Sequence, residues 1–297
     1  MASLKEIRER KASVASTRQI TSAMKMVSAA KLKKAQDAIV QFRPYAEKLQ
    51  EILASVGDSM KDDEDNQFAA QREKERILLV LITSNRGLCG AFNSNVIKAT
   101  VQRALSEFGN QMMAKQVDFI AIGKKGSEFL RKKGYNVIFD GSEIFDNLTF
   151  ERVATMAEMI MNLFTDGEYD HVDVVYNRFK NAGTQILTEE QFLPIKIDEL
   201  ANVKAQEATA FVDYIFEPSK EYIVQELIPR SLKLQFYKAI LDSHASEHGA
   251  RMTAMHKATD NATELLKELS LQFNKARQAS ITNEILEIVS GAEALRG

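Results

Sequence analysis

The last eighty or so residues of the chain carry the pattern that most constrains its fold. From Ser219 to Leu295 there are one proline and two glycines, and apolar or small residues recur at alternating steps of three and four. This spacing keeps one narrow stripe facing a partner helix, which is typical of a coiled coil. At ~1.5 Å per residue the helix would be about 110 Å long, too long for a domain of this size to bury it. The stripe runs through Leu241, His244, His248, Met252, Met255, Thr259, Ala262, Leu266, Leu269, Phe273, Ala276 and Ser280.

A second long helix is predicted over residues 3–56, which contain no glycine and one proline. In its first half we expect the stripe at Ile7, Val14, Ile20, Met24 and Val27, with serine and threonine between them. In its second half the stripe is a clean heptad pattern of Ala35, Ala38, Phe42, Tyr45, Leu49, Ile52 and Val56. We expect the two long helices to form an antiparallel coiled coil, because each then buries the stripe of the other.

Between the helices the hydrophobic period changes to that of an α/β domain. The charged stretch 57–75 is a candidate linker. Buried strands are predicted at 76–83, 117–123, 135–139 and 171–179, a hairpin partner at 183–194, and helices at 93–108, 125–133 and 150–164. Their alternation predicts a small, mostly parallel, Rossmann-like sheet. The predicted domains are an N-terminal coiled-coil helix (1–56), a linker (57–75), a Rossmann-like α/β domain (76–209) and a C-terminal coiled-coil helix (210–297).

Composition excludes several classes of protein. The single cysteine, Cys89, rules out an internal disulfide and any CxxC motif. No apolar run reaches the ~18 residues of a membrane span, and the N-terminus lacks the apolar core of a secretory signal. Residues 1–34 are basic, but aromatic residues are absent before Phe42 and the charges do not form one block. We therefore expect an intracellular protein that binds no nucleic acid.

The loop after the first predicted strand, residues 86–91, lies where phosphate-binding loops occur. It does not match GxGxxG, and the chain contains no GxxxxGK[ST]. The loop after the second strand, Gly123 to Gly126, is equally incomplete. A tight structural turn is favoured over a nucleotide site, and Cys89 has no histidine near it in sequence to make it a nucleophile.

The segment from His244 to His248 matches the HxxEH pattern of some zinc enzymes. A zinc site also needs a third ligand and a cleft. On a straight helix both histidines fall on the expected stripe, so packing is the favoured interpretation. We expect no metal, no cofactor and no catalytic residue.

The two ends resemble the gamma subunit of F-type ATP synthase. The resemblance is carried by Thr17 to Leu32 (TRQITSAMKMVSAAKL), Glu247 to Met255 (EHGARMTAM) and Asn274 to Glu284 (NKARQASITNE). The loop Ser84 to Asn93 (SNRGLCGAFN) matches the middle-domain motif of the family. The resemblance covers the whole chain in order, and the end motifs are its most specific part.

That resemblance implies a rotor without catalytic sites of its own. The coiled coil would be a shaft inside a hexamer of three alpha and three beta subunits, which carry the nucleotide sites. The α/β domain would lie at the foot, against the epsilon subunit and the ring of membrane c subunits. The chain would couple proton-driven rotation of that ring to ATP synthesis. The absence of a presequence favours a bacterial protein, peripheral on the cytoplasmic face of the inner membrane and touching it only through the c-ring.

Residue roles follow from the same resemblance. Met24 and Lys25 match the N-terminal motif that faces the lever region of beta. Arg277 and Gln278 match the C-terminal motif that hydrogen-bonds a catch loop of beta. Tyr214 and Glu217 match the segment that faces epsilon and the c-ring.

Two other interpretations remain open from the residues alone. One is a stand-alone α/β enzyme or phosphate-binding module that dimerises through a coiled coil. It requires titratable groups converging on the loop from Gly87 to Gly90, where the sequence offers only Arg86 and Cys89. The other is a coiled-coil adaptor, which would not need the small hydroxyl-bearing face of the N-terminal helix.

Overall fold

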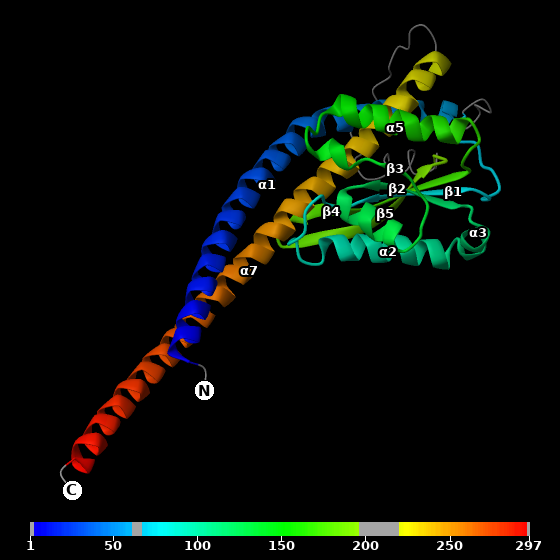
Figure 1. The fold of residues 1–297 in the computed structure, drawn as a ribbon. Helices are drawn as coiled ribbons and strands as arrows, with labels where there is room; N and C mark the ends of the chain where they lie inside the picture. The colour runs from blue at the N-terminus through cyan, green and yellow to red at the C-terminus, as the bar shows by residue number, and fades with distance from the viewer. Residues whose placement is uncertain (1–2, 61–66, 196–219, 296–297) are drawn as a thin grey trace. The chain divides into compact units, whose positions relative to one another are not determined.

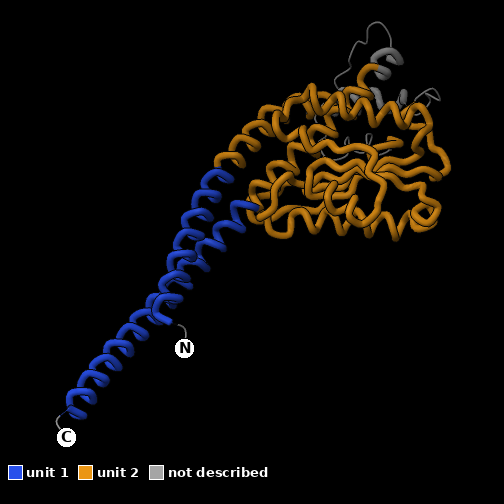
Figure 2. Tube along the Cα trace, viewed as in Figure 1, with its two compact units in different colours: residues 1–29, 251–297 blue, residues 30–250 orange. Residues whose placement is uncertain are grey.

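The computed structural model describes residues 3–60, 67–195 and 220–295 of the chain. Two long helices are present, α1 (Leu4–Met60) and α7 (Lys220–Ala294), as the sequence predicts (Figure 1). The chain divides into two compact units, and both long helices contribute to each of them (Figure 2). The first unit comprises residues 1–29 and 251–297, and the second comprises residues 30–250.

The second unit contains a five-stranded sheet with the strand order β3-β2-β1-β4-β5. The strands are β1 (Ile77–Ile82), β2 (Val117–Ile122), β3 (Val137–Asp140), β4 (His171–Asn181) and β5 (Thr184–Leu193). All neighbours are parallel except β4 and β5, which form an antiparallel hairpin. The predicted Rossmann-like, mostly parallel sheet is confirmed.

Helices cover both faces of this sheet, which explains the continuous apolar run of β1. They are α2 (Phe92–Ser106), α3 (Gly109–Met113), α4 (Lys124–Lys132), α5 (Phe150–Thr165) and the 3₁₀ helix η1 (Ser142–Phe145). Successive side chains of a strand point to opposite faces. Ile77, Leu79 and Leu81 accordingly pack in one core with α2. Leu78, Val80 and Ile82 pack in the other core, with α5 and α7.

Within the second unit, α7 is a core helix of the α/β fold. Its role there goes beyond pairing with α1 in a coiled coil. Ile228, Leu232, Phe236 and Ile240 are almost fully buried in the core that α7 shares with α5 and the sheet. The periodicity of α7 from Leu241 onwards predicts only a helical partner. The sequence does not reveal that Ile228 to Ile240 pack on a sheet. A helix packed on a sheet has the same 3.6-residue period of apolar side chains as a helix packed on another helix.

Candidate functional site

The helix pair of the first unit is built on a strict seven-residue repeat. On α1 the repeat runs through Ile7, Val14, Thr21 and Ser28. Val14 is half-buried, and the other three are buried. The expectation that Ile20 and Val27 lie on this stripe is wrong, since each is 57% exposed. They stand one position before the repeat and therefore lie on its flank.

The partner positions on α7 are Met255, Ala262 and Leu269, again seven residues apart and buried. Thr21 Oγ1 lies 2.9 Å from Thr259 Oγ1. Nearer the N-terminus of α1, the guanidinium of Arg8 lies 5.8 Å from the ring centroid of Phe273. Residue numbers rise on α7 as they fall on α1, so the pair is antiparallel, as predicted.

Hydroxyl groups take the place of large apolar side chains at two turns of the seam. Ser28 Oγ donates to the carbonyl oxygen of Met24 at 2.8 Å, and Thr259 Oγ1 donates to that of Met255 at 2.8 Å. Because these hydroxyls are satisfied within their own helices, they can be buried without a large penalty. At these turns the seam therefore carries small polar side chains in place of large apolar ones.

The four residues expected to contact beta lie in two separate places. Met24 and Lys25 are half-buried on α1, beside the Thr21 to Thr259 contact. Arg277 and Gln278 are exposed on α7. Arg277 lies 18 residues beyond Thr259, or roughly 27 Å along a helix axis. The structure thus keeps the two pairs apart and does not join them in one site. Tyr214 and Glu217 lie outside the described residues.

Beyond Phe273, α7 continues with nearly all of its side chains exposed. Every residue from Asn274 to Leu295 is exposed except half-buried Ala276. From the sequence we expect the turns from Arg277 to Leu295 to lose the strong apolar stripe, and this expectation is wrong. Exposed apolar side chains recur at steps of four and three, at Ile281, Ile285 and Ile288, and Val289 lies four residues after Ile285. This spacing is visible in the sequence and is typical of a helix face that packs against another surface.

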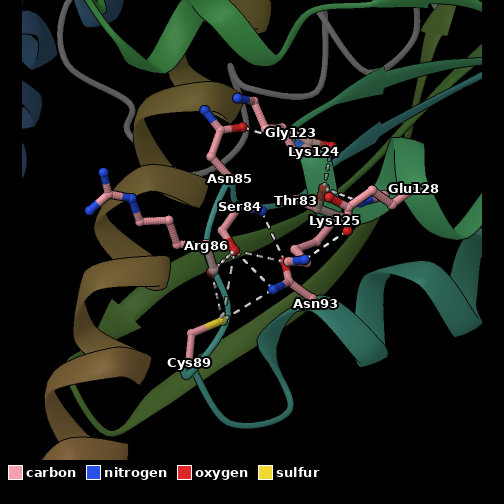
Figure 3. Close-up of polar contacts among 11 residues, drawn as sticks. Thr83, Ser84, Asn85, Arg86, Cys89, Asn93, Gly123, Lys124, Lys125 and Glu128 are labelled. Carbon is pink, nitrogen blue, oxygen red and sulfur yellow. Dashed lines mark hydrogen bonds and ion pairs between the residues drawn. The ribbon is translucent and has the colours of Figure 1, made fainter. Parts of the chain in front are cut away.

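The loop after β1 is closed by its own hydrogen bonds (Figure 3). The amide N–H of Ser84 donates to Asn93 Oδ1 at 2.9 Å, and Ser84 Oγ donates to the carbonyl oxygen of Arg86 at 2.7 Å. Asn93 Nδ2 donates to the buried Cys89 Sγ at 3.2 Å. Leu88 and Gly90 both have positive φ, which makes the turn tight.

The loop after β2 is likewise occupied by protein groups. The amide of Lys124 donates to Asn85 Oδ1, that of Lys125 to the carbonyl oxygen of Ser84, and that of Gly126 to Thr83 Oγ1. A Cβ on Gly123 would lie 2.3 Å from the Thr83 carbonyl oxygen. Phosphate-binding loops present free amides and open space for a ligand. The loop after β2 uses its amides to fasten β1 to β2, which favours the predicted structural turn.

The two histidines of the HxxEH segment pack as side chains of the α/β core. His244 Nε2 and His248 Nε2 lie 3.1 Å apart, and the His244 ring stacks on Phe145 at 5.8 Å. Within the described ranges, no three His, Cys, Asp or Glu side chains are grouped so that they could hold a metal ion. The same ranges contain no helix long and apolar enough to span a membrane.

A charged cluster that sequence reasoning missed joins α2 to β4 and β5. Arg103 Nε donates to the fully buried Asp173 Oδ2 at 2.6 Å, and Arg103 also pairs with Glu189 at 2.9 Å. His171 Nε2 lies 2.8 Å from Asp173 Oδ1. Burial alone would raise the pKa of Asp173, but the hydrogen bonds from His171 and Arg103 hold it below its usual value. The cluster is enclosed, so it holds elements together and offers no open site.

Comparison with known proteins shows which family the chain resembles in sequence. A family model described as ATP synthase matches residues 3–295. The ATP synthase gamma chain of Flavobacterium psychrophilum is 61% identical over 297 residues, covering all of both chains. That of Cytophaga hutchinsonii is 56% identical over 295 residues, 99% of each chain.

Solved structures give the same result. A chain in the central stalk and c-ring structure of Tetrahymena thermophila mitochondrial ATP synthase has a TM-score of 0.56 and 28% identity, over 80% of this chain and 99% of that one. A chain of the Euglena gracilis mitochondrial enzyme has a TM-score of 0.66 over 98% of this chain and 94% of that one, and at 23% identity supports the fold alone. On its sequence and its fold together, the chain belongs to the ATP synthase gamma chain family.

Proposed function

We propose that this chain is the central rotor shaft of an F1Fo ATP synthase, coupling proton-driven rotation of the c-ring to ATP synthesis and hydrolysis. The observation that carries the proposal is the exposed apolar face at the end of α7, on a chain whose full length matches gamma chains. An isolated helix with such a face is unfavourable in water unless another protein surrounds it.

The surrounding protein in this proposal is a hexamer of three alpha and three beta subunits. The tip of α7, from Asn274 to Leu295, enters its bore and turns there as a bearing. The exposed flank of α1, with Ile20, Met26 and Val27 each more than half exposed, faces the same sleeve. Small residues on the seam keep the helix pair thin, and two supercoiled helices keep it stiff.

Stiffness matters because of the energies that the shaft transmits. Each proton crossing ~100 mV yields about 2.3 kcal/mol, so several transfers must accumulate before one nucleotide site changes state. Contacts that are made and broken at every step must be weak by comparison. Exposed polar and charged contacts contribute about 1 kcal/mol or less, which suits Arg277 and Gln278 as contacts to the catch loop of beta, and Met24 and Lys25 as contacts to its lever region.

The α/β domain is the foot of the rotor in this proposal. The segment with Tyr214 and Glu217 contacts epsilon and the c-ring, so that membrane contact is indirect. The assembly lies on the cytoplasmic face of a bacterial inner membrane. The chain itself is non-catalytic, a role supported by the two loops at the carboxyl ends of β1 and β2, whose amides are used within the fold.

Reconstitution tests the proposal. The purified chain is assayed for ATP hydrolysis alone, and again after mixing with alpha and beta subunits. We expect no hydrolysis by the chain alone, and an active complex with one copy of the chain to three alpha and three beta. Hydrolysis by the chain alone, or a mixture in which the chain does not join the complex, would overturn it.

A further inference from the structure

The strand at one end of the sheet, β3, has an open edge with exposed apolar side chains. Among the described strands β3 pairs with β2 alone. Ile138 and Phe139 are 40% and 39% exposed, whereas every residue of β2 is buried. Apolar side chains on an exposed edge strand mark a place where another chain can bind.

The open side of β3 also presents main-chain groups. The amide of Phe119, on β2, donates to the carbonyl oxygen of Asn136 at 2.9 Å, and Val137 lies opposite Phe119 in the parallel register. In this hydrogen-bond pattern the residue opposite directs its own N–H and C=O away from the neighbouring strand. Val137 therefore offers a donor and an acceptor to a strand placed outside β3.

The two ends of the sheet differ in composition. Three of the four residues of β3 are apolar, whereas six of the ten residues of β5, the strand at the other end, are polar or charged. Polar and charged side chains are one means by which an edge strand avoids pairing with other chains. Because β3 is short, main-chain pairing gives a partner few hydrogen bonds, and side-chain contacts must select the partner.

The helix that lies beside this edge, α4, is strongly cationic. Leu130 of α4 packs in the same core as Ala121 of β2. The single carboxylate of α4, Glu128, pairs with Lys125 at 2.7 Å (Figure 3). The cations of α4 and the residue after it are Lys124, Lys125, Arg131, Lys132 and Lys133. This end of the domain therefore attracts an acidic partner.

Arg131 is the cation that the structure ties to β3. It lies one helical turn after Ser127, whose hydroxyl donates to Asp140 of β3 at 2.6 Å, so both are on the side of α4 that faces β3. Partial burial alone would raise the pKa of Asp140, but hydrogen bonds from Ser127 and Ser142 and the nearby charge of Arg131 hold it below its usual value. Arg131 is exposed, so a further carboxylate can approach it beside β3.

A strand added outside β3 would meet a different surface on each of its faces. Asp140 lies opposite Ala121, which packs in the core with α2 and α4. Phe139 lies opposite Ile120, which packs in the core with α5. Paired residues of neighbouring strands share a face of the sheet. The added strand therefore needs acidic side chains on its α4 face and apolar side chains on its α5 face, and these alternate along its sequence.

We propose that the open edge of β3, with Arg131 beside it, binds an extended segment of a partner protein in which acidic and apolar residues alternate. The segment pairs with β3 as an added strand. Its carboxylates lie near α4, and its apolar side chains cover Phe139. A second copy of the chain fits less well, because pairing β3 with β3 would bring two cationic α4 helices together. The surface lies within the α/β domain, so this proposal does not rest on the rotor role.

Fluorescence anisotropy of labelled peptides with the full chain tests the site. The probe is a peptide in which valine and glutamate alternate. One matched peptide has lysine in place of glutamate, and another keeps the acidic sequence but is N-methylated at alternate residues, so that it cannot pair as a strand. We expect only the unmodified acidic peptide to bind, and its binding to weaken as salt is added.

Variants of the chain locate the binding. Arg131→Glu should weaken binding of the acidic peptide by about fivefold. Lys98→Glu, at an exposed lysine of α2, is the matched control and should leave binding unchanged. We also expect the peptide to slow hydrogen exchange at the amide of Val137, which attraction between charges alone would not do. The comparison of peptides on the unaltered chain applies even if Arg131→Glu does not fold.

Three results would overturn the proposal. One is equal binding of the acidic peptide and its N-methylated form, or no binding of either. Another is binding that Arg131→Glu leaves unchanged. The last is a dimer of the full chain, seen by sedimentation, that Ile138→Asp dissociates, because a second copy would then occupy the edge of β3.

Discussion

At the scale of single residues, the charges that matter for stability are the enclosed ones. Asp173 is fully buried and bonded to both Arg103 and His171, whereas Glu189 holds the outer side of the same guanidinium. We expect Asp173→Asn to destabilise the chain by about 1–3 kcal/mol, because Arg103 and His171 lose a buried charged acceptor, while Glu189 and Glu107 still pair with Arg103. Glu189→Gln, the control at the exposed end, should cost about 1 kcal/mol or less. Urea unfolding measures both, and equal effects would contradict this account.

Because of Asp173, we expect the stability of the chain to fall at acidic pH. The pKa of Asp173 is lowered in the folded chain, so its contribution is fully present above the usual aspartate pKa of 3.8. It is lost as the pH falls below that value. Asp173→Asn should therefore flatten the loss of stability below pH 4, which acid titration followed by circular dichroism checks.

Arg277 and Gln278 belong to the same scale, but their expected role is outside the chain. Both are exposed, so Arg277→Ala combined with Gln278→Ala should leave the Tm of the isolated chain nearly unchanged. In the assembled enzyme we expect a loss of coupled ATP synthesis. Lys275→Ala, an exposed neighbour on the same helix, is the control. Unchanged synthesis in the double variant would exclude the catch-loop role.

At the scale of elements, the surroundings of α7 change along its length. The space around two of its glycines differs accordingly. Gly249 lies against the Ala182 backbone, whereas Gly291 has open space around it. Alanine favours a helix over glycine by about 1 kcal/mol. We expect Gly291→Ala to raise helix content at the tip, and Gly249→Ala to lower the Tm because the β4–β5 hairpin must shift. Circular dichroism melts compare them, and a higher Tm for Gly249→Ala would contradict the close contact.

Hydrophobic periodicity predicts the positions of the helices and strands well, but it does not determine which face of a helix is buried. Each strand and helix predicted within the described part of the chain is present, since buried runs and 3.6-residue stripes are local properties of the sequence. The predicted buried face of α1 is wrong at Ile20 and Val27, because the buried positions there are Thr21 and Ser28. Their burial depends on Thr259 and on hydrogen bonds within each helix, which no pattern of hydrophobicity records.

The candidate sites show the same limit. The His171, Asp173 and Arg103 cluster joins residues 70 positions apart. Such contacts follow from the order of strands in the sheet, which the sequence restricts but does not specify. The beta-facing residues came from resemblance to a family, because exposed polar residues such as Arg277 leave no trace in periodicity.

At the scale of the whole molecule, the central claim is that the chain turns as a rotor. Rotation can be observed directly by fixing the alpha and beta subunits to a surface and attaching a bead to an exposed residue of the α/β domain, such as Lys132. When ATP is added, the account predicts unidirectional rotation of the bead that stops when ATP is exhausted. Sustained ATP hydrolysis with a stationary bead on a correctly assembled complex would contradict it.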